Sequence, residues 1–166
     1  MLIFPTLYKE SFVTRVARYA FNFFPAYRRG GGRVLFISAN WQEIHVKIAL
    51  NWATRNYVGS VFGGSLYAAI DPIYMLQLIK ILGDKYIVWD KAATIEFVRP
   101  VKSVVYARFE LNNEIIQKVK EQVLQHGKYF LELPVLLCDA NENTYVKASK
   151  VLYIADKEYY KNKPKK

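Results

Sequence analysis

One segment near the middle of the chain restricts its folding more than any other. The stretch from Val61 to Ile79 holds 19 residues with a single charged side chain, Asp71. A helix that is apolar on every side must be covered by a protein core or by lipid. Because two glycines and the pair Asp71-Pro72 interrupt the stretch, and strong flanking positive charge is lacking, we expect a buried helix over residues 64–82 of a soluble domain.

The segments on either side of this helix alternate between apolar and polar residues, which predicts strands. Residues 34–38 and 44–48 form a predicted hairpin with one buried face. Four further strands are expected over residues 86–98, 103–111, 128–137 and 144–154, with a helix that ends at His126-Gly127 between the second and the third. Strands joined by short turns form antiparallel sheets, so we expect an α+β fold in which such a sheet wraps the long helix.

Residues 7–24 predict an additional amphipathic helix that ends before Pro25. Its apolar side chains recur at spacings of three and four residues; they are Phe12, Val13, Val16, Ala17, Ala20 and Phe24. We expect this face to pack on the body of the protein, and a weak contact with a membrane surface is the alternative. The chain then divides into this helix and a glycine-rich connection (1–32), a main domain (33–156) and a loose basic tail (157–166).

The formal net charge of +10 comes from the two ends of the chain. Residues 1–33 carry six basic side chains and one acidic one, residues 157–166 carry five lysines and one glutamate, and the body between them is nearly neutral. Basic ends attract phosphates or membrane surfaces without specific readout. We therefore expect no nucleic-acid function.

Few side chains are available for metal or covalent chemistry. The chain has two histidines, His45 and His126, and one cysteine, Cys138. No zinc-ligand spacing, serine-hydrolase elbow or phosphate-binding loop is present, so we expect no metal and no cofactor. Asp90, inside an apolar strand, either pairs internally or faces a cleft. The single cysteine, and charged residues where a signal peptide would be apolar, favour a cytoplasmic protein.

The residues from Asn56 to Ser65, and the helix that follows them, carry the candidate chemistry. Gly63 and Gly64 leave backbone N–H groups uncovered at the positive end of a helix, where they can hold a carbonyl oxygen on which negative charge develops. Asp71, one turn or more inside the apolar helix, is costly to bury unless it is paired or used. The structural alternative is that the glycines permit close packing and that Asp71 bonds backbone at a kink.

The order Asn56, Gly59, Gly63-Gly64 and Asp71, followed by strands that reach Phe97-Val98-Arg99-Pro100, resembles the hotdog-fold acyl-CoA thioesterases of the PaaI type, and most closely their DUF4442 subgroup. The similarity covers residues 33–155. It implies a hotdog fold, in which an antiparallel sheet surrounds one long central helix. It also implies that Asn56, Gly63 and Gly64 hold the thioester carbonyl, while Asp71 acts as general base or nucleophile.

One position departs from that family pattern. Phe62 stands where PaaI-type members usually have a histidine, so a polar group near the thioester is lost while the backbone donors remain. Arg99, Lys102 and Arg55 lie in or near loops that could meet the phosphates of coenzyme A, with ordinary surface charge as the alternative. We expect an acyl-CoA thioesterase; a non-catalytic hotdog protein that binds acyl-CoA or an acyl carrier is the alternative.

The spacing within the helix bears on the number of subunits. Gly63 and Asp71 are eight residues apart, which is about 12 Å along a helix at ~1.5 Å per residue. One chain cannot readily bring both to the same carbonyl. A two-fold dimer with antiparallel helices would place Asp71 of one subunit opposite Gly63-Gly64 of the other. We therefore expect a homodimer with two composite sites, or a dimer of such dimers, as the resemblance to hotdog enzymes also implies.

Overall fold

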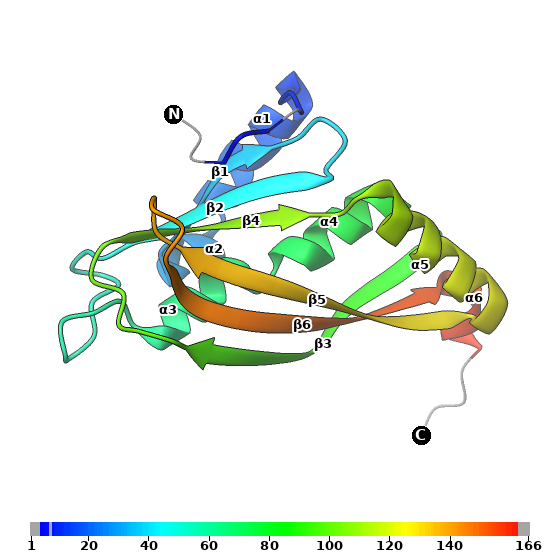
Figure 1. Cartoon of the computed structure of the whole chain (residues 1–166). Coiled ribbons are helices and arrows are strands. Elements are labelled where there is room, and N and C mark those ends of the chain that lie inside the picture. The colour runs from blue at the N-terminus through cyan, green and yellow to red at the C-terminus, as the bar shows by residue number, and fades with distance from the viewer. Residues whose placement is uncertain (1–3, 7, 163–166) are drawn as a thin grey trace.

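The structure of the chain is a computed structural model that describes residues 4–6 and 8–162. Six strands form one antiparallel sheet in the order β1-β2-β4-β5-β6-β3, and the sheet curves around a central helical segment (Figure 1). The α+β architecture expected from the sequence is confirmed. The elements are α1 (Phe12–Phe23), α2 (Pro25–Gly30), β1 (Gly32–Ile37), β2 (Glu43–Ala49), α3 (Gly63–Ile70), α4 (Ile73–Leu82), β3 (Tyr86–Phe97), β4 (Val104–Glu110), α5 (Asn113–His126), β5 (Lys128–Cys138), β6 (Thr144–Asp156) and α6 (Lys157–Lys161).

The expected apolar helix is present, and Asp71-Pro72 divide it into α3 and α4. Pro72 has no N–H to donate into the helix, and helical hydrogen bonding resumes where Leu76 N donates to Pro72 O at 3.0 Å. Val105, Ala107, Phe109 and Leu111 share a fully buried face of the sheet, as predicted. Among the described residues, only Gly63–Leu82 is long and apolar enough to cross a membrane by length and composition alone.

Strand β2 is buried on both faces, so the expectation of a hairpin with one buried face is wrong. Glu43 and His45 on its outer face are buried because the segment before α1 crosses them. Thr6 Oγ1 donates to Glu43 Oε2 at 2.6 Å, and the rings of Phe4 and His45 meet edge to face with centroids 5.2 Å apart. The N-terminal segment thus adds a layer over part of the sheet.

Helix α1 packs against β1 with its polar side inward, so the expected burial of its apolar face is wrong. Val13 and Val16 are exposed, whereas Thr14 is buried. The physical reason is a pair of hydrogen bonds to the edge strand. Asn22 Nδ2 donates to Val34 O at 2.9 Å, and Val34 N donates to Asn22 Oδ1 at 2.8 Å. These bonds hold the polar side of the helix on β1.

The sequence predicted a loose tail from residue 157 onward. This expectation is wrong for residues 157–161. They form α6, and the Asp156 carboxylate caps it by accepting from Glu158 N and Tyr159 N. Residue 7, within the first predicted helix, and residues 163–166 of the tail lie outside the described residues. The division of the chain into three parts stays a prediction.

Candidate active site

The first turn of α3 is open to an oxygen ligand. Phe62 occupies the N-cap position and provides no side-chain hydrogen bond. Its carbonyl accepts from Ser65 N at 2.9 Å and from Leu66 N at 3.1 Å. The N–H groups of Gly63 and Gly64 come before these, where an α-helix offers no internal acceptor. Both lie at the positive end of the helix dipole, which suits a developing oxyanion.

The two glycines also make room for aromatic rings. A Cβ atom on Gly63 would lie 2.9 Å from Cζ of Phe97, and a Cβ atom on Gly64 would collide with the ring of Phe62. Phe62 is 56% exposed, and its ring lies beside Gly64 while Gly64 itself stays exposed. The close packing named above as the structural alternative is therefore present together with the open helix start.

A cavity of about 430 Å³ beside this helix start gathers three predicted site residues, since Asn56, Gly63 and Arg99 all line it. Phe97 and Leu66 supply apolar walls. The guanidinium of Arg99 lies 5.4 Å from the centroid of the Tyr145 ring, which positions its charge at the cavity. One cavity thus offers backbone donors, an apolar wall and a fixed cation.

The Asn56 side chain forms its hydrogen bonds within its own loop. Its Oδ1 accepts from Val58 N at 3.1 Å and from Ser60 N at 3.0 Å, and its Nδ2 donates to Ser60 Oγ at 2.9 Å. Arg55 and Lys102 are exposed and lie outside the lining of the cavity. A substrate contact by any of these three predicted site residues stays a prediction.

Asp71 borders a different cavity. A space of about 260 Å³ joins it to aromatic residues of the N-terminal segment, namely Phe21, Phe24 and Tyr27. Tyr27 Oη donates to Ala69 O at 3.0 Å and fixes α2 on α3, and burial raises the pKa of Tyr27. No local pattern in the sequence connects residues 21–27 with residue 71, so this aromatic contribution was not predicted.

The Asp71 side chain forms an ion pair with Lys150. Lys150 Nζ lies 2.5 Å from Asp71 Oδ1 and 2.9 Å from Asp90 Oδ1, and it donates to Tyr67 Oη at 3.3 Å. Burial alone would lower the pKa of Lys150, but its hydrogen bonds to the two carboxylates outweigh burial and raise it. Lys150 is buried, whereas the Asp71 side chain is 41% exposed. Asp71 is therefore the more accessible carboxylate of the cluster, since the Asp90 side chain is 24% exposed.

A β-bulge turns Asp90 toward this cluster. Ala93 pairs with Lys150 on the inner face of the sheet, and strict alternation from there would point Asp90 outward. The register shift between Asp90 and Ala92 inserts one residue and brings Asp90 opposite the buried Leu152. Asp90 pairs internally, which decides the question left open by the sequence. Burial raises the pKa of Asp90, although Lys150 opposes that shift.

Lys150 belongs to this cluster and was not predicted as a site residue. The alternation of β6 places Ala148, Lys150 and Leu152 on the buried face. A lysine at such a position signals a buried ion pair, because lysine is almost never fully buried without a partner. In the part of the chain that the structure describes, no group of three or more His, Cys, Asp or Glu side chains could hold a metal ion.

Comparison with known protein families shows to which family the chain belongs. Residues 16–154 match the model of a domain of unknown function, DUF4442. The chain belongs to the DUF4442 family. The match runs from within α1 to near the end of β6, so it includes both halves of the candidate site. No curated protein matches the sequence.

Solved structures show the fold of this DUF4442 protein. Pseudomonas aeruginosa PA5026, a protein of unknown function and probable thioesterase, has a TM-score of 0.75 at 19% identity over 86% of this chain and 95% of that one. The thioesterase HI1161 of Haemophilus influenzae has a TM-score of 0.64 at 15% identity, over 91% of this chain and 96% of that one. E. coli PaaI, from the phenylacetic acid degradation operon, has a TM-score of 0.60 at 13% identity, over 84% of this chain and 91% of that one. At these identities the likeness concerns the fold alone, and the predicted hotdog fold is confirmed.

Proposed function

We propose that this DUF4442 protein is an acyl-CoA thioesterase whose active sites form between two copies of the chain. The observation that carries the proposal is the division of the site between two cavities. Gly63, at the open start of α3, lines one cavity, and the exposed carboxylate of Asp71 lines the other. The first half has oxyanion donors and lacks a base, and the second has a base and lacks oxyanion donors. Related folds that are named thioesterases support the reaction class.

The free edge of β3 supports the pairing of two copies. β3 is the last strand of the sheet, and a long uncovered edge is a template for another strand. In an antiparallel pair of β3 strands, the Phe97 end of one lies against the Asp90 half of the other. Phe97 covers Gly63, and Asp90 shares Lys150 with Asp71. The pairing therefore moves Gly63 of one subunit toward Asp71 of the partner subunit.

The proposed reaction is general-base hydrolysis of the thioester. Water attacks the carbonyl carbon while the Asp71 carboxylate accepts a proton from it, and the oxyanion that forms accepts hydrogen bonds from the N–H groups of Gly63 and Gly64. Collapse of this intermediate breaks the C–S bond, and the Asp71 carboxyl returns its proton to the leaving sulfur. The products are a carboxylic acid and a free thiol. Lys150 fixes one Asp71 oxygen, which leaves the other for water.

The phosphates of coenzyme A lie at the far end of its pantetheine arm, so the substrate requires cations at the mouth of the site rather than at the thioester. Arg99 is the cation that we assign to its phosphates, because Arg99 lines the cavity at Gly63. Its guanidinium is held against Tyr145, so little side-chain freedom is lost on binding. Arg55 and Lys102 are exposed outside the lining of this cavity and would contribute long-range attraction.

The direct test measures hydrolysis by the full chain across a panel of acyl-CoA chain lengths. Asp71→Asn is expected to lower kcat by about 10²-fold or more, because a positioned general base contributes at least that factor. Asp84→Asn, which removes an exposed carboxylate beyond α4, is the matched control and should leave kcat unchanged. Turnover by Asp71→Asn at the parent rate would contradict the mechanism.

The shared site has a test of its own. Gly63→Val and Asp71→Asn should each be inactive as homodimers, and mixing equal amounts with subunit exchange should restore about a quarter of the parent activity, since half the dimers then hold one intact site of two. Circular dichroism of each variant checks that it is folded. Mixtures that stay inactive although mixed dimers are demonstrated would mean that both groups act within one subunit.

A second function, acyl-CoA or acyl-carrier binding without hydrolysis, is favoured by one observation. The ring of Phe62 lies against Gly64, next to the N–H groups that would have to bind the carbonyl oxygen. Tight binding of acyl-CoA without turnover would support this function. In that case Phe62→His should produce turnover if Phe62 alone blocks the chemistry, and Phe62→Leu is the control for a smaller side chain without a polar group.

A further inference from the structure

Helix α1 presents its apolar face to solvent. The exposed fractions are 79% for Phe12, 70% for Val13, 52% for Val16 and 67% for Phe23. At 3.6 residues per turn these side chains lie on one side of the helix, together with Tyr19. An exposed apolar patch of this kind marks a contact with a partner or a membrane.

The opposite, polar side of α1 fixes this orientation. Arg18 Nε donates to Glu10 Oε1 at 2.7 Å and its Nη2 donates to Glu10 Oε2 at 3.1 Å. Asn22 exchanges two hydrogen bonds with the backbone of Val34, and Thr14 is buried. Rotating the helix to bury its apolar face would break all four bonds. The outward direction of the aromatic and aliphatic side chains is therefore built into the fold.

A basic hollow adjoins the apolar face. It has a volume of about 550 Å³ and lies between α1, α2, the start of β1 and the loop after β2. Arg28, Arg29 and Arg33 line it, no acidic side chain does, and Tyr19 and Phe23 of α1 form another part of its wall. The Arg28 guanidinium lies 5.9 Å from the centroid of the Phe23 ring. None of the ion pairs among the described residues involves these three arginines.

We propose that α1 and this basic hollow dock the protein on the surface of an anionic phospholipid membrane. The apolar face, with Phe12, Val16 and Phe23, enters the boundary between headgroups and acyl chains, and the arginines of the hollow meet lipid phosphates. A helix with a wide apolar face and arginines beside it is the structure that binds such an interface. The inference goes beyond the proposed hydrolysis and does not depend on it.

Charge decides between lipid and a second copy of the chain as the occupant. Glu10 is the one acidic residue among residues 1–33, and its carboxylate is already paired with Arg18 and Arg15. Two copies that met through their α1 faces would bring two uncompensated arginine clusters together, which is unfavourable. An anionic lipid surface supplies the opposite charge. The apolar face and the hollow therefore fit an anionic membrane better than they fit the same surface on a second copy of the chain.

The test is flotation of the full chain with phosphatidylcholine vesicles that contain or lack phosphatidylglycerol. The protein should float with the anionic vesicles and be released by high salt, which screens exposed charges. Val16→Asp should lower the partition coefficient by about tenfold or more, because a charge would replace the apolar side chain that enters the membrane. Arg29→Gln should lower it about fivefold, the share of one basic residue near an anionic surface.

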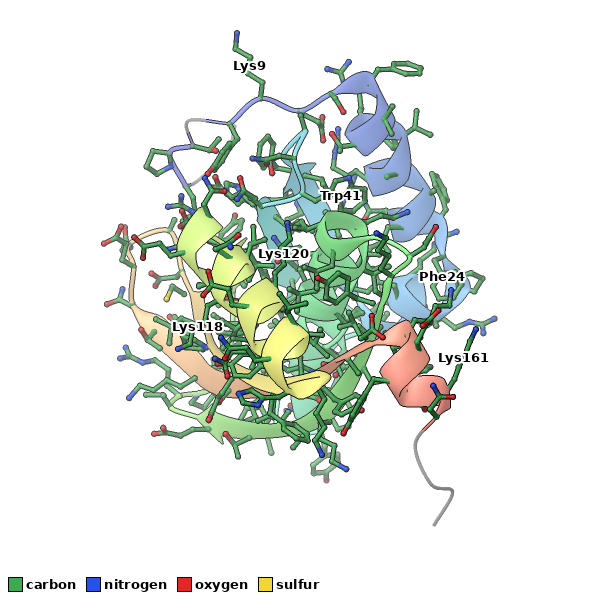
Figure 2. All side chains as sticks on the ribbon, turned by 90° about the vertical axis from the view of Figure 1, so that its right-hand side faces the viewer. Lys9, Phe24, Trp41, Lys118, Lys120 and Lys161 are labelled. Carbon is green, nitrogen blue, oxygen red and sulfur yellow. The ribbon has the colours of Figure 1, made fainter. Side chains whose placement is uncertain are left out.

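Matched control changes lie on α5, which faces the viewer in Figure 2 while α1 lies above it and to the right. Leu124 is 87% exposed on α5, so Leu124→Asp tests an apolar side chain outside the proposed surface. Lys118→Gln removes a charge from the same helix, where Lys118 is labelled. Neither control should change the partition coefficient, and thermal melting should confirm that all variants are folded.

Four results would overturn the inference. The first is equal or absent flotation with both kinds of vesicle. The second is a loss of binding that the α5 controls reproduce. The third is sedimentation that shows Val16→Asp dissolving an oligomer while lipid binding is unchanged, because α1 would then contact a second copy. An Arg29→Gln variant that raises KM for acyl-CoA and leaves flotation unaltered would assign the hollow to substrate phosphates and would also overturn it.

Discussion

Lys150 sets the charge balance of the candidate site at the scale of single residues. Its ammonium is buried between Asp71 and Asp90. Lys150→Met would leave two carboxylates facing each other with no cation. We expect a loss of about 1–3 kcal/mol in the free energy of unfolding, less than for a fully buried pair because both carboxylates are partly exposed. Urea denaturation measures it. Lys150→Met combined with Asp90→Asn should recover part of the loss, and a single variant as stable as the parent would show that the ion pairs are not stabilising.

The same three residues show how far sequence reasoning reaches at this scale. Asp71 could be identified because a carboxylate in an apolar helix needs a partner or a use. Its partner could not be identified, because Lys150 lies 79 positions away and only the curvature of the sheet joins them. The direction of Asp90 depends on a bulge, and no local pattern in the strand marks the extra residue. Gly63 and Arg99 line one cavity, and the roles expected for them from the sequence stay predictions.

At the scale of elements, the covered outer face of β2 predicts a pH dependence of stability. Burial lowers the pKa of His45, although its hydrogen bond to Glu43 opposes that shift. An unfolded histidine has a pKa of about 6.5, so below that pH the unfolded chain takes up a proton that folded His45 does not. Stability should therefore fall as the pH drops below 6.5 toward the folded pKa, with a slope of at most about 1.4 kcal/mol per pH unit.

Urea denaturation between pH 7 and pH 5 measures this slope. His45→Gln should flatten it, because the variant has no group that titrates at that position. His126→Gln is the matched control, since His126 is exposed at the end of α5 and should leave the slope in place. A slope that His45→Gln leaves unchanged would show that another group governs acid destabilisation.

Periodicity predicted which segments form helices and which form strands. It did not always predict which face of an element is buried. All six strands and the apolar helix lie where alternation and spacing place them, because one face of each is buried against the others. Helix α1 has an equally clear period, yet its apolar face points outward. Amphipathic spacing shows that two faces differ and does not show which one meets the protein. In α1, Asn22 decides this by bonding the edge strand, a tertiary contact that has no local signal.

At the scale of the whole molecule, the two edge strands of the sheet, β1 and β3, differ. The edge at β1 is occupied by α1 and the Asn22 side chain, whereas the edge at β3 is uncovered among the described residues. Figure 1 shows α1 and β3 at opposite ends of the sheet. Membrane docking through α1 would therefore leave β3 available for a second copy, so the two proposals are compatible in one molecule.

The dimer proposal then rests on β3 and can be tested there. Thr94 is exposed on this strand, and a lysine on an edge strand opposes pairing with another edge. Thr94→Lys should sediment as a monomer, keep the parent's circular dichroism and lose hydrolytic activity, since each monomer has half a site. Gln125→Lys on α5 adds the same charge away from the edge and should change none of these properties. A monomeric Thr94→Lys variant with full activity would show that one chain completes the site, whereas a dimeric, active one would show that the copies meet elsewhere.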